Sequence, residues 1–230
     1  MNSIIEYFST LDWDFVRSTG LLLIQGAFVT LKITLLSVSC GVLIGLFVGI
    51  AELSHYKLLK YPAKVYVDII RGTPLLVQIF IIYFALPAIL GMRIEPYIAA
   101  VVACSINSGA YVAEIFRAGI QSIDKGQFEA GRSLGLTWSQ TMRKIVIPQA
   151  FRRTIPQLGN EFIAMLKDSS LVSVIGYEEL TRKGQLVIAA TYRSFEIWTA
   201  VAIIYLIMTL TIRRLVAYLE KKYNSNGQQK

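Results

Sequence analysis

Four long stretches of this chain contain no charged side chain. They cover residues 33–51, 72–92, 96–113 and 197–212. Because roughly 20 helical residues cross a bilayer core about 30 Å thick, these stretches predict membrane-spanning helices, with only the last one short. A helix satisfies its own backbone hydrogen bonds, which a segment in lipid requires. A soluble domain with 54% hydrophobic residues would expose too much apolar surface, so the pattern predicts an all-α membrane protein.

A fifth, more polar stretch also shows helical periodicity, so we expect five spans in a single domain covering residues 1–230. The expected spans are residues 18–52, 63–86, 96–117, 152–168 and 197–213. In the first span, residues 18–30 are separated from the rest by Lys32, and they either extend that helix outward or lie in the outer interface.

Small residues and proline predict two local features of these spans. Gly41, Gly45 and Gly49 recur every four residues, which predicts a face that another helix approaches closely. Pro74 lies inside the second span, where it removes a backbone hydrogen bond and predicts a kink.

The charges are distributed unevenly among the connections between the spans. The chain has 23 lysine and arginine residues against 15 aspartate and glutamate residues, a net charge of +8. The basic residues concentrate in the 52–64 connection, the 117–153 segment and the C-terminal end, whereas the other connections are neutral, balanced or acidic. By the positive-inside rule this predicts an external N-terminus and a cytoplasmic C-terminus. The net charge is therefore explained by topology, and no nucleic-acid partner is expected.

The residues that commonly perform catalysis do not form a recognisable constellation. Cys40 and Cys104 both fall inside predicted spans, where small apolar packing residues are expected rather than a disulfide or metal site. His55 is the only histidine, and it lies in a basic connection. The chain has no phosphate-binding loop pattern of glycines followed by Gly-Lys-Ser/Thr. We therefore expect a protein that is not itself an enzyme and holds no cofactor.

One motif in the basic segment 118–149 identifies a family. The chain reads Glu129-Ala130-Gly131-Arg132-Ser133-Leu134-Gly135, then nine residues, then Ile145-Val146-Ile147-Pro148. This closely resembles the EAA signature of permease subunits of ABC importers. Two positions depart from the signature, since Gly131 replaces the second alanine and Ile147 replaces a leucine.

The resemblance implies a type I ABC importer transmembrane domain and a role for the motif. Glu129 to Gly135 would form a short coupling helix that lies in a groove of an ATPase subunit. The small residues Ala130 and Gly131 would allow close approach there, and Gly135 would permit a sharp exit from the helix.

Further stretches resemble the polar amino acid permeases, which handle histidine, arginine, lysine, glutamine and similar substrates. These stretches are residues 26–31 leading to Leu35-Leu36-Ser37, Arg71-Gly72-Thr73-Pro74-Leu75 and Ser169-Ser170-Leu171. The similarity covers most of residues 20–215. The resemblance implies a bacterial plasma membrane protein that works as a dimer, either with a second copy or with a paralogue. It also implies two ATPase subunits that bind ATP and magnesium, and an external solute-binding protein.

Polar residues inside the spans predict where the substrate binds. Gln157, Asn160, Glu161, Ala164 and Asp168 share one face of the fourth span, and Glu161 lies near the middle of the bilayer. An ionisable residue at that depth usually faces a protein interior or a watery path. We expect Glu161 to contact a substrate amine or guanidinium, oriented by Asn160. Asp168 lies nearer the outer surface, where it suits a gate or the docking surface for the binding protein.

Two other spans place polar groups at a similar depth. Asn107 and Thr73 are expected to orient the substrate as well, and Gln78 and Tyr111 follow about one turn further along their helices.

Three alternatives remain open at this point. Glu161 could instead pair with Arg71 or Lys167 without touching substrate. The whole chain could also be an ion-coupled secondary amino acid carrier, because such carriers use carboxylates at the same depth. It could finally be a membrane scaffold that does not transport anything.

Overall fold

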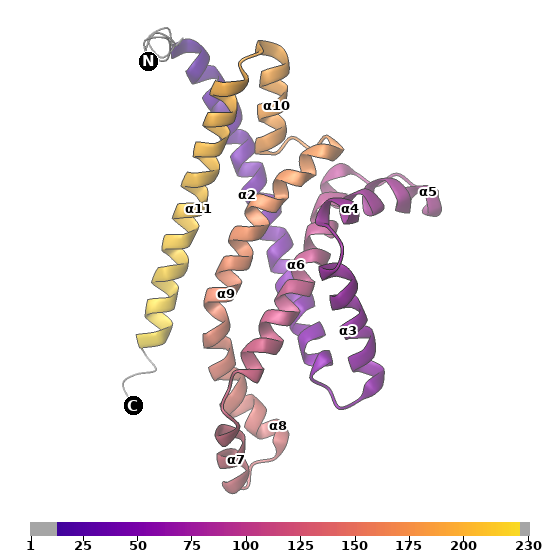
Figure 1. Cartoon of the computed structure of the whole chain (residues 1–230), viewed down its shortest axis with the longest axis vertical. Coiled ribbons are helices and arrows are strands. Elements are labelled where there is room, and N and C mark those ends of the chain that lie inside the picture. Colours follow the sequence, from indigo (N-terminus) through magenta and orange to yellow (C-terminus); the bar gives the residue numbers. More distant parts are fainter. Residues whose placement is uncertain (1–12, 226–230) are drawn as a thin grey trace.

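The computed structural model describes residues 13–225, and these residues form helices and turns without a strand. In chain order the elements are α2 (Trp13–Glu52), α3 (Lys57–Arg71), α4 (Leu75–Phe80), the π-helical turn η1 (Ile81–Ala85), α5 (Leu86–Leu90), α6 (Pro96–Gln121), α7 (Lys125–Ser133), α8 (Trp138–Thr141), the π-helical turn η2 (Met142–Val146), α9 (Ile147–Asp168), the 3-10 helix η3 (Ser169–Ile175), α10 (Leu180–Thr191) and α11 (Ser194–Ser225). The long helices run along the molecule, with α7 and α8 at one end and α10 at the other (Figure 1). The prediction of an all-α protein is confirmed.

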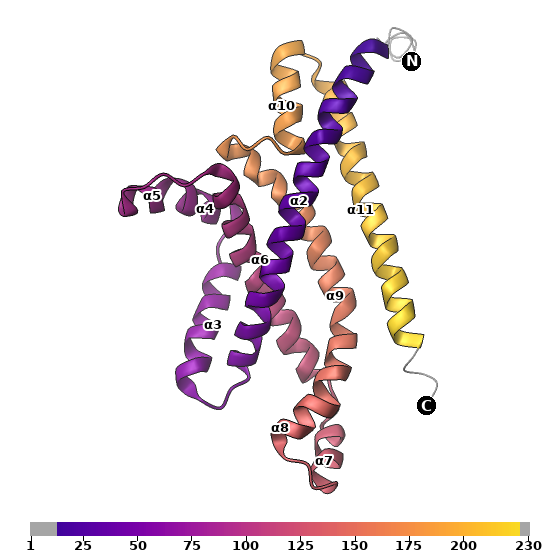
Figure 2. The same ribbon diagram turned by 180° about the vertical axis from the view of Figure 1, so that it is seen from behind.

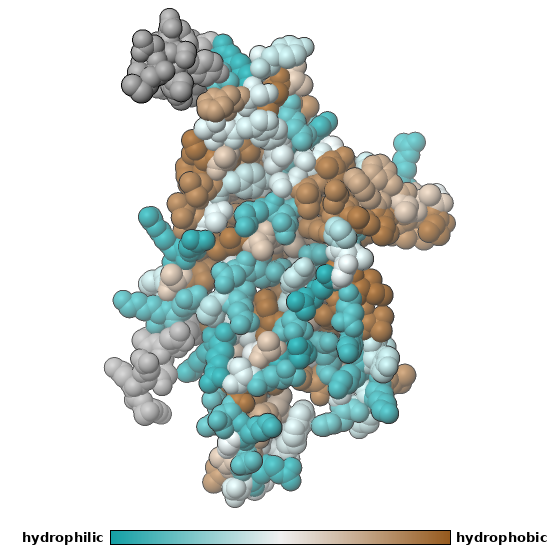
Figure 3. All heavy atoms as spheres, in the orientation of Figure 1, coloured by the Kyte–Doolittle hydropathy of each residue, from teal (hydrophilic) through white to brown (hydrophobic). Residues whose placement is uncertain are grey.

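Three of the described helical segments have the length and composition of membrane spans. They are Arg17–Glu52, Pro96–Gln121 and Ser194–Lys222, and the pair formed by α3 and α4–α5 would add a fourth if it crosses as one bent span. The helix α9 is long enough but carries too many charged residues to qualify, so the fourth predicted span, residues 152–168, stays a prediction. Figure 3 shows apolar side chains over the arm made by α4 and α5, and polar ones around the α7 end.

The helix α2 is continuous, so residues 18–30 belong to the same helix as the rest of the first predicted span. Lys32, which interrupts the apolar pattern, lies over the ring of Tyr97 with its Nζ 5.3 Å from the ring centroid. The glycine face of α2 packs directly on α6. A Cβ atom at Gly45 would lie 2.6 Å from the Cβ of Val112, which is closer than real atoms approach. The predicted packing face is therefore confirmed.

The second predicted span is broken into two separate helices, whereas the sequence predicted only a kink. The helix α3 ends at Arg71, α4 begins at Leu75, and the two segments are bent by 104° (Figure 2). Pro74 adopts an extended conformation and disfavours a helical conformation for Thr73 before it, so the helix cannot continue through this point. The arm formed by α4, η1 and α5 consequently projects sideways from the bundle.

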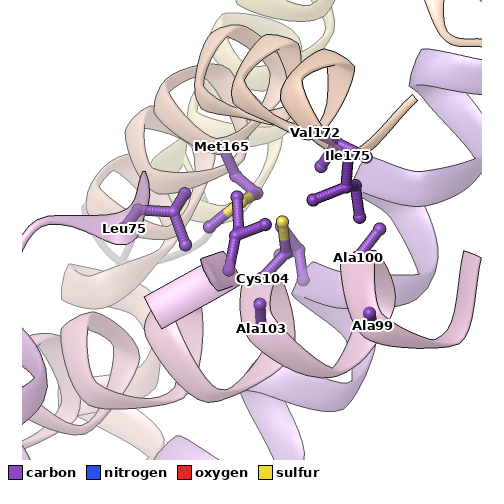
Figure 4. Packing of buried hydrophobic residues seen from close by; sticks show 10 residues of the cluster. Leu75, Ala99, Ala100, Ala103, Cys104, Met165, Val172 and Ile175 are labelled. Atoms are coloured by element: carbon purple, nitrogen blue, oxygen red, sulfur yellow. The ribbon is translucent and has the colours of Figure 1, made fainter. Parts of the chain in front are cut away.

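The central core joins α2, α4, α6, α9 and η3. Its buried members are Val38, Leu75, Ile79, Ala99, Ala100, Ala103, Cys104, Met165, Val172 and Ile175. Figure 4 shows Cys104 among small α6 side chains and Met165. Both cysteines are free, and Cys104 is fully buried, which matches the expected packing role. Small side chains on α6 let the four other elements pack against this one helix.

Candidate functional site

Three of the predicted substrate residues meet at the break between α3 and α4. The side-chain N–H of Asn107 donates to Oε1 of Gln78 at 3.0 Å. Nε2 of Gln78 donates in turn to Thr73 Oγ1 at 3.0 Å, to the Thr73 carbonyl at 3.1 Å and to the Ile70 carbonyl at 2.8 Å. We call Thr73, Gln78 and Asn107 the amide network. It satisfies carbonyl groups that the end of α3 leaves free, so it stabilises the break.

Tyr111 lies one turn beyond Asn107 on α6, next to a group of charged residues. The guanidinium of Arg71 lies over the Tyr111 ring, 5.3 Å from its centroid. Arg71 Nη1 is also 3.7 Å from Glu114 Oε2, and Arg117 Nε donates to the same oxygen at 3.0 Å. Arg71 therefore pairs with Glu114 and not with Glu161, which decides one of the open alternatives.

Glu161 lies on α9, where it is half-buried against Ser108 of α6. The Ser108 hydroxyl is buried and makes no hydrogen bond of regular geometry with any described residue. Within the described part of the chain, Glu161 also has no ion-pair partner, so pairing with Lys167 is not observed. The Glu161 carboxylate is thus available to a further partner.

The other predicted residues of α9 surround Glu161 without contacting the amide network. Gln157, Asn160 and Asp168 are exposed, and Asp168 lies within electrostatic reach of Glu161. Asn107 turns toward Gln78, whereas Ser108, the next residue, meets Glu161. The structure therefore divides the predicted substrate group into two parts.

The predicted coupling segment forms α7 and a turn that ends it. Asp124 caps the start of α7, because its Oδ1 accepts a hydrogen bond from the Gly126 N–H at 2.6 Å. At the other end Gly135 has φ +78°, a left-handed conformation that glycine adopts without steric cost. The Leu136 N–H then donates to the Gly131 carbonyl at 3.1 Å, which closes the helix end. The expected sharp exit at Gly135 is observed.

Within this segment the small residues differ in their surroundings. Gly131 is buried, and a Cβ atom there would lie 2.6 Å from Thr141 Cγ2 of α8. Its small size is therefore needed for packing inside the chain. Glu129 and Ala130 are exposed, and Leu134 is 78% exposed. These three side chains are free to contact another protein.

A small core fixes α7 to the two helices that precede and follow the coupling segment. Its buried members are Ile123, Met142, Val146 and Ala150, and Phe128 of α7 packs against them. Arg153 of α9 also donates a hydrogen bond to the backbone carbonyl of Ser122, which follows α6. These contacts connect α7 to both α6 and α9.

Sequence reasoning missed Glu179, whose side chain is completely buried. It caps α10 by accepting hydrogen bonds from the Thr181 and Arg182 N–H groups at 2.9 and 2.8 Å. It also accepts from Tyr205 at 3.0 Å and from Thr30 at 3.3 Å, which links α10 to α11 and α2. Burial raises the pKa of the Glu179 carboxyl, and these four donors oppose that rise. Isolated polar residues in apolar helices, such as Thr30, were the available signal.

Comparison with known proteins agrees with this geometry. Residues 41–225 match the family described as binding-protein-dependent transport system inner membrane component. The chain is 47% identical over 212 residues to the glutamine transport system permease protein GlnP of Escherichia coli, covering 92% of this chain and 97% of the relative. It is 39% identical over 204 residues to the arginine transport system permease protein ArtQ of Bacillus subtilis, covering 89% and 93%.

A solved structure shows the same architecture. The crystal structure of an amino acid ABC transporter with histidines superposes with a TM-score of 0.88 at 48% identity, covering 93% of this chain and 99% of that chain. The resemblance found in Glu129 to Gly135 is therefore confirmed over most of the chain. This chain belongs to the family of inner membrane components of binding-protein-dependent transport systems, the permeases of ABC importers.

Proposed function

We propose that the chain forms the translocation path for polar amino acids, with basic side chains favoured. The relatives are named for glutamine and arginine transport, and the structural neighbour is an amino acid transporter. The observation that carries the proposal is that the coupling segment is connected to the two helices that hold Glu161 and Ser108. The exposed tip of α7 is fixed to α6 and α9, and these are the helices that present Ser108 and Glu161 to each other.

The proposed assembly supplies what this chain lacks. Two ATPase subunits bind ATP and magnesium and receive α7, while an external binding protein delivers the amino acid. A second permease copy completes the walls of the path, since few helices in one chain are available to line it. In this proposal α9 is the fourth of five spans, and its polar face is turned to the path. The N-terminus lies outside and the C-terminus lies in the cytoplasm of a bacterial plasma membrane.

Alternating access follows from the way α7 is attached. Closure of the ATPases moves α7, and the core around Met142 passes that motion to α6 and α9. The contact between Ser108 and Glu161 then opens or closes, because the two residues lie on different helices. A substrate ammonium or guanidinium suits the Glu161 carboxylate, since a charge-assisted hydrogen bond compensates a charge inside the membrane. The exposed Asn160 and Gln157 offer neutral hydrogen-bonding groups beside it.

Reconstitution with the ATPase and the binding protein tests the proposal. ATP hydrolysis stimulated by a panel of amino acids is measured for the wild type, for Glu161→Gln and for a control, Glu95→Gln, in the exposed connection before α6. Stimulation by arginine and lysine is expected to need about tenfold more amino acid in Glu161→Gln, because one charged partner is lost. The control is expected to match the wild type.

Three outcomes would change the proposal. Unaltered stimulation in Glu161→Gln would remove Glu161 from the substrate site. Preference of the wild type for glutamate would contradict a site built on a carboxylate. Uptake that continues without ATPase subunits would favour the ion-coupled carrier.

A further inference from the structure

A second concave site lies between α2, α3 and α6, on the cytoplasmic side in the proposed orientation. Its cavity measures about 410 Å³, within the usual range for small-molecule sites. Charges of both signs line it, from Glu52, Lys60, Lys64, Asp68, Glu114 and Arg117. It adjoins a second hollow of about 750 Å³ that continues past His55. Neither candidate site described above includes this cavity.

Only part of this charge is neutralised inside the chain. Glu114 is paired with Arg117 and Arg71, as described above. Lys60, Lys64, Asp68 and Glu52 have no ion-pair partner within 4.0 Å among the described residues. Oε2 of Glu52 is also buried and accepts no hydrogen bond from the described part of the chain. Two ammonium groups and two carboxylates therefore remain for a ligand.

The helix α3 has a charged face and an apolar face, and the charged face lines this cavity. Lys60, Lys64 and Asp68 recur at helical spacing and line the cavity. The opposite side of the helix is apolar and exposed, with Leu59 at 55% and Ile69 at 57% exposed. Such a face suits lipid. The charged face is thus directed away from lipid and toward a watery space, where charges in a membrane protein are functional.

A polar stripe on α6 connects the amide network with the cavity. Asn107, Tyr111, Glu114 and Gln121 follow one another at intervals of four, three and seven residues, which places them along one face. Arg71 bridges the middle of this stripe, since it contacts both the Tyr111 ring and Glu114. The cavity therefore lies at the end of a continuous polar track.

We infer that this cavity is an exit site that binds the α-amino and α-carboxylate groups of an amino acid before its release. Lys60 and Lys64 hold the carboxylate, and Asp68 and Glu52 hold the ammonium group. A simple anion would use only the lysines, whereas a zwitterion neutralises both pairs. The inference rests on the proposed function, because it takes the transported amino acid as the ligand. It follows that amino acid accumulated on the cytoplasmic side occupies the site and slows further uptake.

Inhibition from inside the vesicle tests the exit site. The full complex is placed in vesicles with the α7 end inside, together with ATP and increasing amounts of the transported amino acid. ATP-driven uptake of labelled amino acid is measured and divided by each protein's own uptake into vesicles without internal amino acid. The internal concentration that halves uptake is expected to rise about tenfold in Lys64→Gln and in Asp68→Asn, because each loses one charge-assisted contact.

Matched variants separate the site from general charge effects. Lys64→Arg keeps the positive charge and is expected to retain inhibition close to the wild type. Lys221→Gln removes a positive charge from the exposed end of α11 and is expected to behave as the wild type. Internal N-acetyl and α-amide derivatives, which each lack one charge, are expected to inhibit about tenfold less.

The possible failures are distinguishable. A wild type without ATP-driven uptake would contradict the proposed function. A wild type that transports but shows no internal inhibition, or the same inhibition in Lys64→Gln and Asp68→Asn, would overturn the exit site alone. Equal inhibition by the N-acetyl derivative would show that the cavity selects an anion and not a zwitterion, which also overturns it.

Discussion

The amide network and the coupling segment were both predicted from sequence to touch a molecule outside the chain, but their surroundings differ. In the network, Gln78 and Asn107 are buried and hydrogen-bonded to each other, and Gln78 also holds the broken end of α3. In the coupling segment, Glu129 and Leu134 are exposed. The sequence therefore shows which side chains are polar. Whether such a side chain can bind a molecule outside the chain depends on whether neighbouring helices already satisfy its hydrogen bonds.

Adjacent residues of the coupling segment also differ in whether they face the inside of the chain or the outside. Gly131 faces Thr141 inside the chain, and Ala130 faces outward. A substitution that changes an inward-facing group should lower the stability of the permease by itself. A substitution that changes an outward-facing group should alter only its interactions with partners.

The largest loss of stability is expected for Gln78→Leu. This change leaves the Asn107 side chain and two backbone carbonyls without their partner, and each buried polar group left unsatisfied costs about 1–3 kcal/mol. The free energy of unfolding of the purified permease should fall by about 3 kcal/mol in a denaturant titration. The control Gln157→Leu, at an exposed position of α9, should change it by less than about 0.5 kcal/mol. A stable Gln78→Leu protein that no longer transports would instead identify Gln78 as a substrate ligand.

A smaller loss is expected for Gly131→Val. The new side chain would overlap Thr141, and overpacking of this kind costs about 1–3 kcal/mol. Thermal unfolding of the permease should therefore begin at a lower temperature than in Ala130→Val, where the side chain is exposed. Equal unfolding temperatures for the two variants would show that α7 and α8 do not pack as described.

The smallest effect on stability, but a clear effect on assembly, is expected for Leu134→Ser. Leu134 is exposed, so the free energy of unfolding should change by less than about 0.5 kcal/mol. If the ATPase buries this side chain, its affinity for the permease should fall about tenfold, as measured with the purified subunits. Leu58→Ser is the matched control, because Leu58 is equally apolar and exposed but lies on α3. A similar loss of affinity in both variants would mean that Leu134 is not a specific contact.

Several features of the fold were predictable because they depend on local sequence. Uncharged stretches identified α2, α6 and α11, the spacing of Gly41, Gly45 and Gly49 identified the face that packs on α6, and Gly135 marked the end of α7. The break after Arg71 was expected at the right place but only as a kink. The two segments are bent by 104°, and Gln78 of α4 donates a hydrogen bond back to the Ile70 carbonyl of α3, a contact that the sequence did not indicate.

The sequence by itself determined the class of protein, its family and the positions of most helices, because hydropathy, helical spacing and the Glu129–Gly135 motif are read over short segments. Only the tertiary structure decided which polar residues are satisfied. Asn107 meets Gln78, 29 residues away, and Thr30 meets Glu179, 149 residues away. Hydrogen-bond partners in a membrane protein come from whichever helices pack together, and no local pattern records that choice. For the same reason the charged cavity beside Glu52 became visible only once α2, α3 and α6 were placed in space.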